Sequence, residues 1–417
     1  MKNLLIIGFV WPEPNSTAAG SRMLQLISLF QKNGFTVTFV CAASKTTNSF
    51  DLEKLNIQTF YILLNDSSFD SLIKKINPNF VLFDRFLTEE QFGWRIAENC
   101  PEAIRILDTE DLHFLRNARQ VAHQNNTTVS LSDLMSDLAK REIASIYRCD
   151  LTLIISKYEM KLLKKTFKID KSLLLYLPFL LNKMNMEALD SYPSFQNRNH
   201  FITIGNFKHE PNWNSVQYLK TDIWPLIREK LPEAEMHIYG AYAKEKVQQL
   251  HNKKEGFLIK GWAENLEDVF TNTRVCLAPL RFGAGLKGKL IDAMKFGTPS
   301  VTTNIGAEAM HYKLPWNGFI TDDPTEFALK AVELYSNQKI WEDAQQKGIE
   351  IINTCYSKEK YEKKLLNNIE NIQKNIVEHR LQNFIGSLLM YHNLQSTKYM
   401  SKWIEEKNKP SRIHKIN

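Results

Sequence analysis

Alternation of short apolar runs with amphipathic stretches constrains the fold of this chain more than any other feature. The run NLLIIGF (3–9) precedes SRMLQLISLFQKNG (21–34), whose apolar residues recur at helical spacing, and the run TVTFVCAA (36–43) follows directly. Further apolar runs, each ending in a polar residue, lie at 79–84, 103–108 and 150–156. Repeated strand–helix units predict a parallel, doubly wound sheet with ligand sites at the carboxyl ends of its strands.

A second set of the same units follows a weaker stretch at about 182–199, which we interpret as a linker. It begins with HFITIGNF (200–207), and its further apolar runs lie at 235–240, 256–262, 274–280 and 299–304. The sequence therefore predicts an α/β protein with two Rossmann-like domains, each a doubly wound parallel sheet, at 1–185 and 200–355. Two such domains leave a cleft between them, where ligands usually bind. Residues 356–417 are expected to form a basic helical tail.

The cysteines and histidines favour a cytoplasmic protein without a bound metal. Five cysteines are scattered along the 417 residues with no C-x-x-C pair, which fits a reducing compartment better than disulfides or a zinc site. The ten histidines form no H-E-x-x-H motif and no neighbouring pair at ligand spacing. The opening MKNLLIIGFVWPEP imitates a short signal peptide, but we favour a buried first strand, because a helical stretch and another strand follow directly.

Positive charge is concentrated in the tail. The formal net charge is +7, and from Lys358 onward ten Lys and two Arg face six Glu, so 12 − 6 = +6 of it lies there. The tail is interpreted either as a solvated helical face or as a surface for an anionic membrane, at its inner face, or for a phosphate-bearing acceptor. A nucleic-acid partner is not expected, because no motif with base-reading residues is present.

The stretch GAGLKGKL (283–290) satisfies three phosphate-binding patterns at once. Gly283, Gly285 and Gly288 spell the dinucleotide fingerprint G-x-G-x-x-G, and Gly288 with Lys289 completes most of a P-loop. The P-loop is disfavoured because Leu290 stands where a hydroxyl should coordinate magnesium. The dinucleotide fingerprint is disfavoured because it belongs on the first strand of a domain, although an acid at the expected ribose spacing follows.

The third interpretation is a glycine turn at the mouth of a helix that binds a nucleotide-sugar diphosphate. A helix beginning near Lys287 or Gly288 would present unpaired N–H groups and the positive end of its dipole. Lys287 and Lys289 would add full positive charge, and Asp292, one turn after Lys289, could accept ribose hydroxyl protons. The alternative is that the lysines are merely solvated and that Asp292 lies at the surface.

Residues 275–308, VCLAPLRFGAGLKGKLIDAMKFGTPSVTTNIGAE, resemble the donor-site segment of GT-B glycosyltransferases, particularly the retaining enzymes of glycosyltransferase family 4. The segments 202–240 and 258–270 are similar to the start of that family's donor domain and to the strand and turn against which its nucleotide base packs. The resemblance implies a GT-B fold whose carboxyl-terminal helices pack back on the first domain. It also implies a donor-binding set: Gly205, Asn206, Gly261, Trp262, Gly283, Gly285, Gly288, Asp292, Gly306 and Glu308.

The chain departs from the family pattern at two places. Many members carry two glutamates here, whereas Asp292 replaces the second and Ala284 stands at the first. Members also often place Arg and Lys after the first donor-domain strand, where this chain has only Lys208 as a basic residue. We therefore expect Lys287 and Lys289 to supply the positive charge that stabilises the departing diphosphate.

The first domain is expected to face the cleft with two segments. The loop PEPNSTAAGSRMLQL (12–26) resembles the family's loop after the first strand, and it offers Ser16, Thr17 and Gly20 as acceptor-loop residues. The segment LDTEDLHFLR (107–116) follows a strand and offers catalytic candidates: Glu110, Asp111 and His113, beside Lys287 and Lys289. The alternative is that Asp108 or Asp111 caps the following helix.

The resemblance implies a metal-independent glycosyltransferase that uses a nucleoside-diphosphate sugar, of UDP or GDP type, and needs no further cofactor. The implied acceptor is a glycan, a lipid-linked glycan or another hydroxyl, and the implied outcome is retention of configuration. A sugar-nucleotide epimerase of the same two-lobed fold and a non-catalytic nucleotide-sugar-binding protein are the alternatives. A dinucleotide oxidoreductase ranks last.

Overall fold

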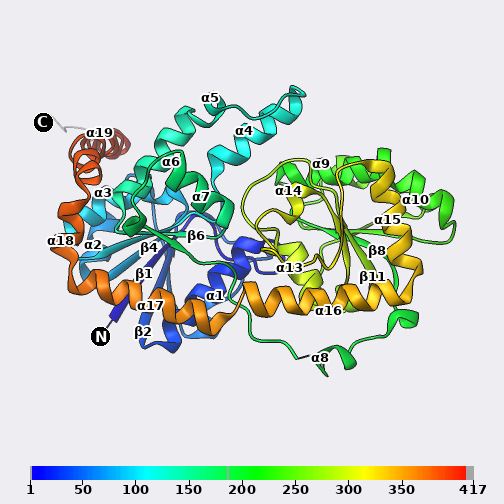
Figure 1. The fold of residues 1–417 in the computed structure, drawn as a ribbon. Coiled ribbons are helices and arrows are strands. Elements are labelled where there is room, and N and C mark those ends of the chain that lie inside the picture. The colour runs from blue at the N-terminus through cyan, green and yellow to red at the C-terminus, as the bar shows by residue number, and fades with distance from the viewer. Residues whose placement is uncertain (1, 186, 410–417) are drawn as a thin grey trace, which may run out of the picture.

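A computed structural model describes residues 2–185 and 187–409 and shows two α/β domains beside each other (Figure 1). The first domain is built on a seven-stranded sheet in the order β3-β2-β1-β4-β5-β6-β7. Its strands are β1 (Lys2–Gly8), β2 (Phe35–Cys41), β3 (Gln58–Tyr61), β4 (Phe80–Asp84), β5 (Ile104–Asp108), β6 (Leu151–Ile154) and β7 (Leu174–Tyr176). All its strand pairs are parallel.

The second domain repeats this architecture with a six-stranded sheet in the order β10-β9-β8-β11-β12-β13. Its strands are β8 (Asn199–Ile204), β9 (Met236–Tyr239), β10 (Phe257–Gly261), β11 (Thr273–Ala278), β12 (Ser300–Thr302) and β13 (Gly318–Ile320), again paired in parallel. The predicted pair of Rossmann-like, doubly wound parallel sheets is confirmed. The strand order reverses beside β1 in one sheet and beside β8 in the other, and ligands bind at such switch points.

Helices cover both faces of each sheet, as the amphipathic stretches indicate. In the first domain they are α1 (Ala18–Lys32), α2 (Ser68–Ile76), α3 (Phe86–Asn99), α4 (His113–Gln124), α5 (Leu131–Leu134), α6 (Asp137–Arg148) and α7 (Lys157–Lys165). The connection and the second domain contain α8 (Glu187–Asp190), α9 (Glu210–Tyr218), α10 (Trp224–Lys230), α11 (Glu245–Gln248), α12 (Leu266–Thr271), α13 (Gly288–Lys295), α14 (Asn304–Ala307) and α15 (Pro324–Ser336).

The chain then returns from the second domain to the first through α16 (Gln338–Cys355) and α17 (Lys358–Lys374), which run in series along one side of the molecule (Figure 1). Trp341 of α16 is buried in the core of the second domain, whereas Leu365 and Ile369 of α17 are buried against the first sheet. At the crossing point Leu181 exchanges backbone hydrogen bonds with the segment around Tyr356 and Lys358.

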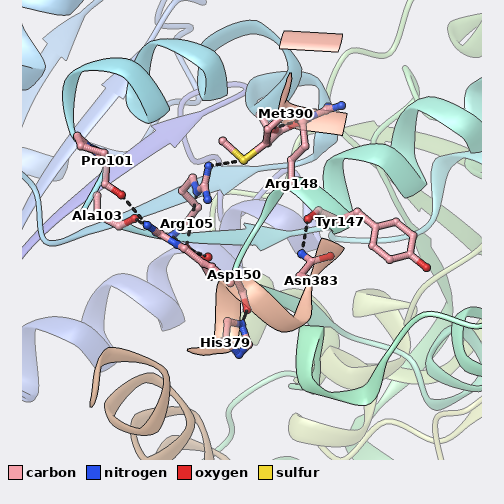
Figure 2. Close-up of polar contacts among 11 residues, drawn as sticks. Pro101, Ala103, Arg105, Tyr147, Arg148, Asp150, His379, Asn383 and Met390 are labelled. Atoms are coloured by element: carbon pink, nitrogen blue, oxygen red, sulfur yellow. Dashed lines mark hydrogen bonds and ion pairs between the residues drawn. The ribbon is translucent and has the colours of Figure 1, made fainter. Parts of the chain in front are cut away.

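The last helix, α19 (Phe384–Asn408), lies on α3 and α6 of the first domain, and α18 (Ile376–Gln382) links it to α17 (Figure 1). A polar network fastens them at the amino ends of β5 and β6 (Figure 2). Arg380 donates to both carboxylate oxygens of Asp150 at 2.9 Å, and Asn383 donates to the carbonyl oxygen of Tyr147 at 2.7 Å. Residues 410–417 of the expected tail lie outside the described residues.

Three short strands were not predicted from the sequence: β3, β7 and β13. Each has only three or four residues, so neither alternation nor a long apolar run marks it. All five cysteines are free and buried. Among the described residues, no helix combines the length and the apolar character needed to cross a bilayer.

Candidate active site between the two domains

A pocket of about 460 Å³ lies where the carboxyl ends of the two sheets meet. The first domain lines it with the loop after β1 and the loop after β5, and the second domain with the loop after β8 and the glycine turn before α13. Its lining includes Ser16, Thr17, Glu110, Asp111, His113, Gly205, Asn206, Gly283, Gly285, Lys287, Gly288, Lys289 and Asp292. Most residues of the predicted site are therefore gathered in one place.

Two helix amino ends meet in this pocket. α13 begins at Gly288, directly after Lys287, and α1 begins behind Thr17, whose hydroxyl accepts a hydrogen bond from Gly20 N at 2.9 Å. A Cβ added at Gly288 would lie 2.5 Å from the Cβ of Ala18, so only glycine lets the two helices approach this closely. The positive ends of both helix dipoles thus converge on one space, which favours an anion there.

Lys289 is held in the pocket by the first turn of α9. Its Nζ donates to Asn212 Oδ1 at 2.9 Å, and Asn212 Nδ2 donates to the carbonyl oxygen of Asn206 at 3.0 Å. A Cβ at Gly205 would lie 2.6 Å from Asn212 Cγ, so this glycine makes room for the amide. Burial lowers the pKa of Lys289 to about 8. Because the amide is neutral, the ammonium keeps its charge available for an anionic ligand.

Lys287 has a different environment. Its buried Nζ donates to two carbonyl oxygens of its own turn, at 3.2 Å to Ala284 and 2.8 Å to Gly285. Burial lowers its pKa to about 8, while the carboxylate of Glu308 favours the charged form. This ammonium therefore holds the glycine turn in shape as well as adding positive charge to it.

Glu159, in the first turn of α7, reaches the glycine turn from the other domain. Its Oε1 accepts hydrogen bonds from Gly285 N at 2.8 Å and from Leu112 N at 3.1 Å. Burial, together with the nearby carboxylate of Asp111, raises the pKa of Glu159 to about 7. Sequence reasoning missed this residue, although it follows the end of β6 at the distance at which His113 follows the end of β5.

Asp292 lies four residues into α13, where it lines the main pocket and an adjoining pocket of about 310 Å³. Burial raises its pKa to about 6, against the opposing influence of Lys295. The side chain is thus neither a surface group nor a cap. It stands beside the helix mouth, where the sequence interpretation expects a ribose.

Glu110 faces the pocket from the first domain in a strained backbone conformation. Its φ is +60°, and Arg85, across the pocket lining, has φ +71°, a region that non-glycine residues seldom adopt. The Oε1 atom of Glu110 is buried without a hydrogen-bond partner. Burial and the neighbouring Asp108 raise the pKa of Glu110 well above its usual range. The shift favours the protonated form of this carboxyl group, which is the form that can donate a hydrogen bond.

Asp111 and His113 form a second polar group in the lining. Burial alone would raise the pKa of Asp111, but Arg116, which donates to both its oxygens, and His113, 3.6 Å away, hold that pKa well below its usual range. Burial lowers the pKa of His113 to about 4 in spite of Asp111. At neutral pH the pocket therefore contains an ionised Asp111 and an uncharged imidazole.

The capping role considered for Asp108 and Asp111 is wrong. Glu142 of α6 accepts hydrogen bonds from His113 N and Phe114 N, both at 3.1 Å, and thereby caps α4 from another helix. Asp108 instead forms a fully buried ion pair with Arg22 of α1, with contacts of 2.9 to 3.1 Å.

Five residues of the predicted site lie outside the pocket lining: Gly20, Gly261, Trp262, Gly306 and Glu308. Gly20 packs under the loop before α1, because a Cβ there would lie 2.5 Å from the backbone of Glu13. Gly306 packs equally tightly on Thr302. Glu308 binds Arg119 of α4 through two contacts of 2.8 Å, and Arg119 also donates to the carbonyl oxygen of Gly283. This clasp joins the two domains beside the glycine turn.

One cluster among the described residues has the composition of a metal site, far from the pocket at the amino ends of β8 and β9. His200, Glu235 and His237 place their donor atoms within 4.8 Å of one another. His237 Nε2 lies 2.7 Å from Glu235 Oε2, and burial lowers the pKa of both histidines, with the positive charge of Lys260 acting in the same direction. The same charge opposes a bound cation, so we assign no metal to this cluster.

Comparisons with known proteins agree with this geometry. Residues 198–337 match the family described as Glycosyl transferases group 1. Sucrose-phosphate synthase from Thermosynechococcus elongatus shares the fold with a TM-score of 0.67 at 14% identity, covering 89% of this chain and 99% of that chain. The chain thus has the GT-B fold, and its second domain matches a family of glycosyltransferases.

The chain is also similar in fold to two structures that contain UDP. A TarM variant from S. aureus, in complex with fondaparinux, alpha-GlcNAc-glycerol and UDP, is 11% identical with a TM-score of 0.65, covering 88% of this chain and 99% of that chain. Anabaena HepE, in complex with UDP and glucose, is 11% identical with a TM-score of 0.62, covering 89% and 100%. No curated protein matches the chain in sequence.

Proposed function

We propose that the protein transfers a sugar from a nucleoside-diphosphate sugar, with UDP as the first carrier to test, to a hydroxyl group of a glycan or lipid-linked acceptor. Retention of configuration, independence of metal and a cytoplasmic location complete the proposal. The resemblance to family 4 supports retention, and the scattered cysteines support the location. The observation that carries the proposal is the convergence of two helix amino ends and the ammonium of Lys289 on one pocket.

Glycosyl transfer demands this kind of site. Negative charge grows on the departing diphosphate while the sugar carbon becomes electron-poor, so fixed N–H groups and cations around the diphosphate stabilise the transition state. The mouth of α13 supplies those groups from the second domain, and Asp292 stands one turn away for the ribose. The diphosphate would therefore lie against the second domain, with its sugar directed across the cleft.

The first domain would hold the sugar and the acceptor. The carboxyl group of Glu110 and the neutral imidazole of His113 can form hydrogen bonds with sugar hydroxyls, and ionised Asp111 can accept them.

The test begins with thermal unfolding in the presence of UDP, GDP, ADP and dTDP and of their sugars, because a ligand that prefers the folded state raises its apparent stability. The bound donor is then incubated with glycan and lipid-linked acceptors, and release of the nucleotide is measured. We expect one diphosphate to stabilise the protein and acceptor-dependent release. Conversion of the donor alone into an isomer, observed by NMR, would favour an epimerase, and binding without turnover on any acceptor would favour a binding protein.

A further inference from the structure

An exposed apolar surface runs along the two last helices. We call it the outer face of α18–α19; it consists of Val377, Leu381, Phe384, Ile385, Leu388, Tyr391, Tyr399, Met400 and Trp403. Each of these side chains keeps between 44% and 72% of its surface exposed to solvent. In α19 the residues Phe384, Leu388, Tyr391, Tyr399 and Trp403 follow one another at spacings that keep them on one side of a helix.

The inner face of α19 carries polar contacts beside the half-buried side chains of Leu389, Met390 and Ile404, whereas larger apolar side chains lie on its outer face, which departs from the usual arrangement of a surface helix. Such a helix normally turns its apolar stripe toward the core and its charges toward water. Here Lys398 binds Glu98 of α3 at 2.9 Å, and Glu405 lies 3.5 Å from the buried guanidinium of Arg95. Arg95 also donates to Ser401, which is buried in the same contact. Polar contacts fasten the helix to the domain, and the larger apolar side chains point outward.

The contacts shown in Figure 2 fix this orientation at the start of α19. Asn383 binds the carbonyl oxygen of Tyr147, and its side chain also caps α19 by accepting from Gly386 N at 2.9 Å. A Cβ at Gly386 would lie 2.2 Å from the same carbonyl oxygen, so glycine allows the helix to lie close to α6. Met390 Sδ contacts Arg105 at 2.9 Å. The helix therefore cannot rotate to bury its outer face without breaking these contacts.

We propose that the outer face of α18–α19 docks the protein on an anionic lipid bilayer. Phe, Leu, Tyr and Trp are the side chains that interfacial helices insert at the boundary between headgroups and acyl chains, and Tyr and Trp keep a polar edge in water. Lys402 and Lys407 flank Trp403, and the Lys407 ammonium lies 5.1 Å from the Trp403 ring. The nearby acids are already engaged, Glu405 by Arg95 and Glu406 by Lys409, so the lysines determine the local charge.

A second exposed group lies on the same side of the first domain in Figure 1. Val121, Leu131 and Met135 are exposed on and around α4 and α5, and α4 also carries His113 of the pocket. A bilayer under α19 and the α5 region would bring the open cleft close to the membrane surface. A lipid-linked acceptor could then reach the pocket without leaving the bilayer.

Flotation with lipid vesicles tests the proposal. The full chain is mixed with vesicles of phosphatidylcholine alone or of phosphatidylcholine with about one third phosphatidylglycerol, and the bound fraction is measured. We expect binding to the anionic vesicles, weakened at high salt, and at least tenfold weaker binding by the variant Phe384→Ser/Tyr399→Ser/Trp403→Ser. The matched control is Tyr312→Ser/Leu329→Ser, which removes side chains of the second domain that are 62% and 54% exposed.

Equal vesicle binding by the two variants would overturn the proposal, as would the absence of binding by the unaltered protein. If light scattering shows that the unaltered protein and the control are dimers and that only the α19 variant is a monomer, the surface binds a second copy of the chain instead. Thermal stabilisation by UDP is measured on every variant. Because the outer face does not line the pocket, this response must remain unchanged, so failure of the docking proposal is distinguishable from failure of the proposed reaction.

Discussion

Glu159 and Gly285 are joined across the cleft by a hydrogen bond of 2.8 Å, from the backbone N–H of the glycine turn to a carboxylate oxygen of the other domain. The glycine turn thus binds an acidic group of its own protein at a position suited to a ligand's anion. Lys287 lies close enough to influence the same carboxylate. Donor binding must compete with Glu159 or proceed beside it, and either case makes this side chain a determinant of donor affinity.

Replacing Glu159 by Gln tests this competition. The pKa of Glu159 is raised to about 7, so the side chain is mostly neutral at pH 6 and mostly negative at pH 8. A negative side chain repels a diphosphate, and the repulsion must therefore increase as the pH rises through 7. We expect equal UDP affinities of variant and unaltered protein at pH 6, and affinity about fivefold higher for Glu159→Gln at pH 8, by calorimetry.

The control for that experiment is Glu90→Gln, which removes a carboxylate paired with Arg141 at the surface of the first domain. It should bind UDP like the unaltered protein at both pH values. The outcome against this account is a ratio of UDP affinities, Glu159→Gln to unaltered protein, that is the same at pH 6 and pH 8. It would show that the carboxylate of Glu159 does not face the diphosphate.

Lys289→Ala should abolish much of the donor affinity without damaging the fold, because among the described residues the ammonium donates only to the neutral amide of Asn212. We expect nucleoside-diphosphate affinity to fall at least tenfold, which corresponds to about 1.4 kcal/mol. Lys287→Ala should weaken binding and also lower the unfolding temperature, because that ammonium bonds two carbonyl oxygens of the turn. Calorimetry and thermal unfolding of both variants, with Lys330→Ala as control, separate the two roles.

The clasp between Arg119 and Glu308 should hold the domains closed. Both side chains are largely buried and form two parallel contacts of 2.8 Å, a geometry that lysine cannot reproduce. We expect a double-mutant cycle of Arg119→Ala and Glu308→Ala to give a coupling of about 1 kcal/mol or more in unfolding. Arg119→Lys should behave like Arg119→Ala and increase the radius of gyration in solution scattering. A coupling near zero would leave Glu308 free for the donor-binding role that the family resemblance implies.

The pair Arg22–Asp108 is fully buried below the pocket, so removing one partner leaves an uncompensated charge. We expect Asp108→Asn to lower the free energy of unfolding by about 3–5 kcal/mol, measured with denaturant. The double variant Arg22→Met/Asp108→Leu should recover most of that loss, because it removes both buried charges. Asp137→Asn, at an exposed ion pair with Lys140, should leave the denaturation midpoint unchanged.

The fold follows from the sequence wherever an element is long enough to show a period. The runs that became β1, β4, β5 and β11 are continuous and apolar because they are buried on both faces of a parallel sheet. β13 has three residues and no such signal, so only its pairing with β12 defines it. The carboxyl ends of the strands then bring Glu110 and Lys289 to one pocket, as the switch-point rule predicts.

The parts of the site that the sequence did not predict are contacts between the domains. Glu159 binds Gly285 across 126 residues of chain, and Arg119 binds Glu308 across 189 residues. Such pairings depend on how the two domains close, and local patterns carry no information about that closure. Gly288 has the same explanation. A Cβ at this position would collide with Ala18 of the other domain, so the contact between the domains requires glycine here, as the approach of a ligand does.

The structure of the complex with UDP tests the central claim most directly. The account predicts the diphosphate at the mouth of α13, within hydrogen-bonding distance of Lys289 Nζ and of the first backbone N–H groups of the helix, with the ribose at Asp292. An empty mouth in a complex whose nucleotide binds elsewhere, or a mouth still filled by Glu159 and Lys287, would contradict it.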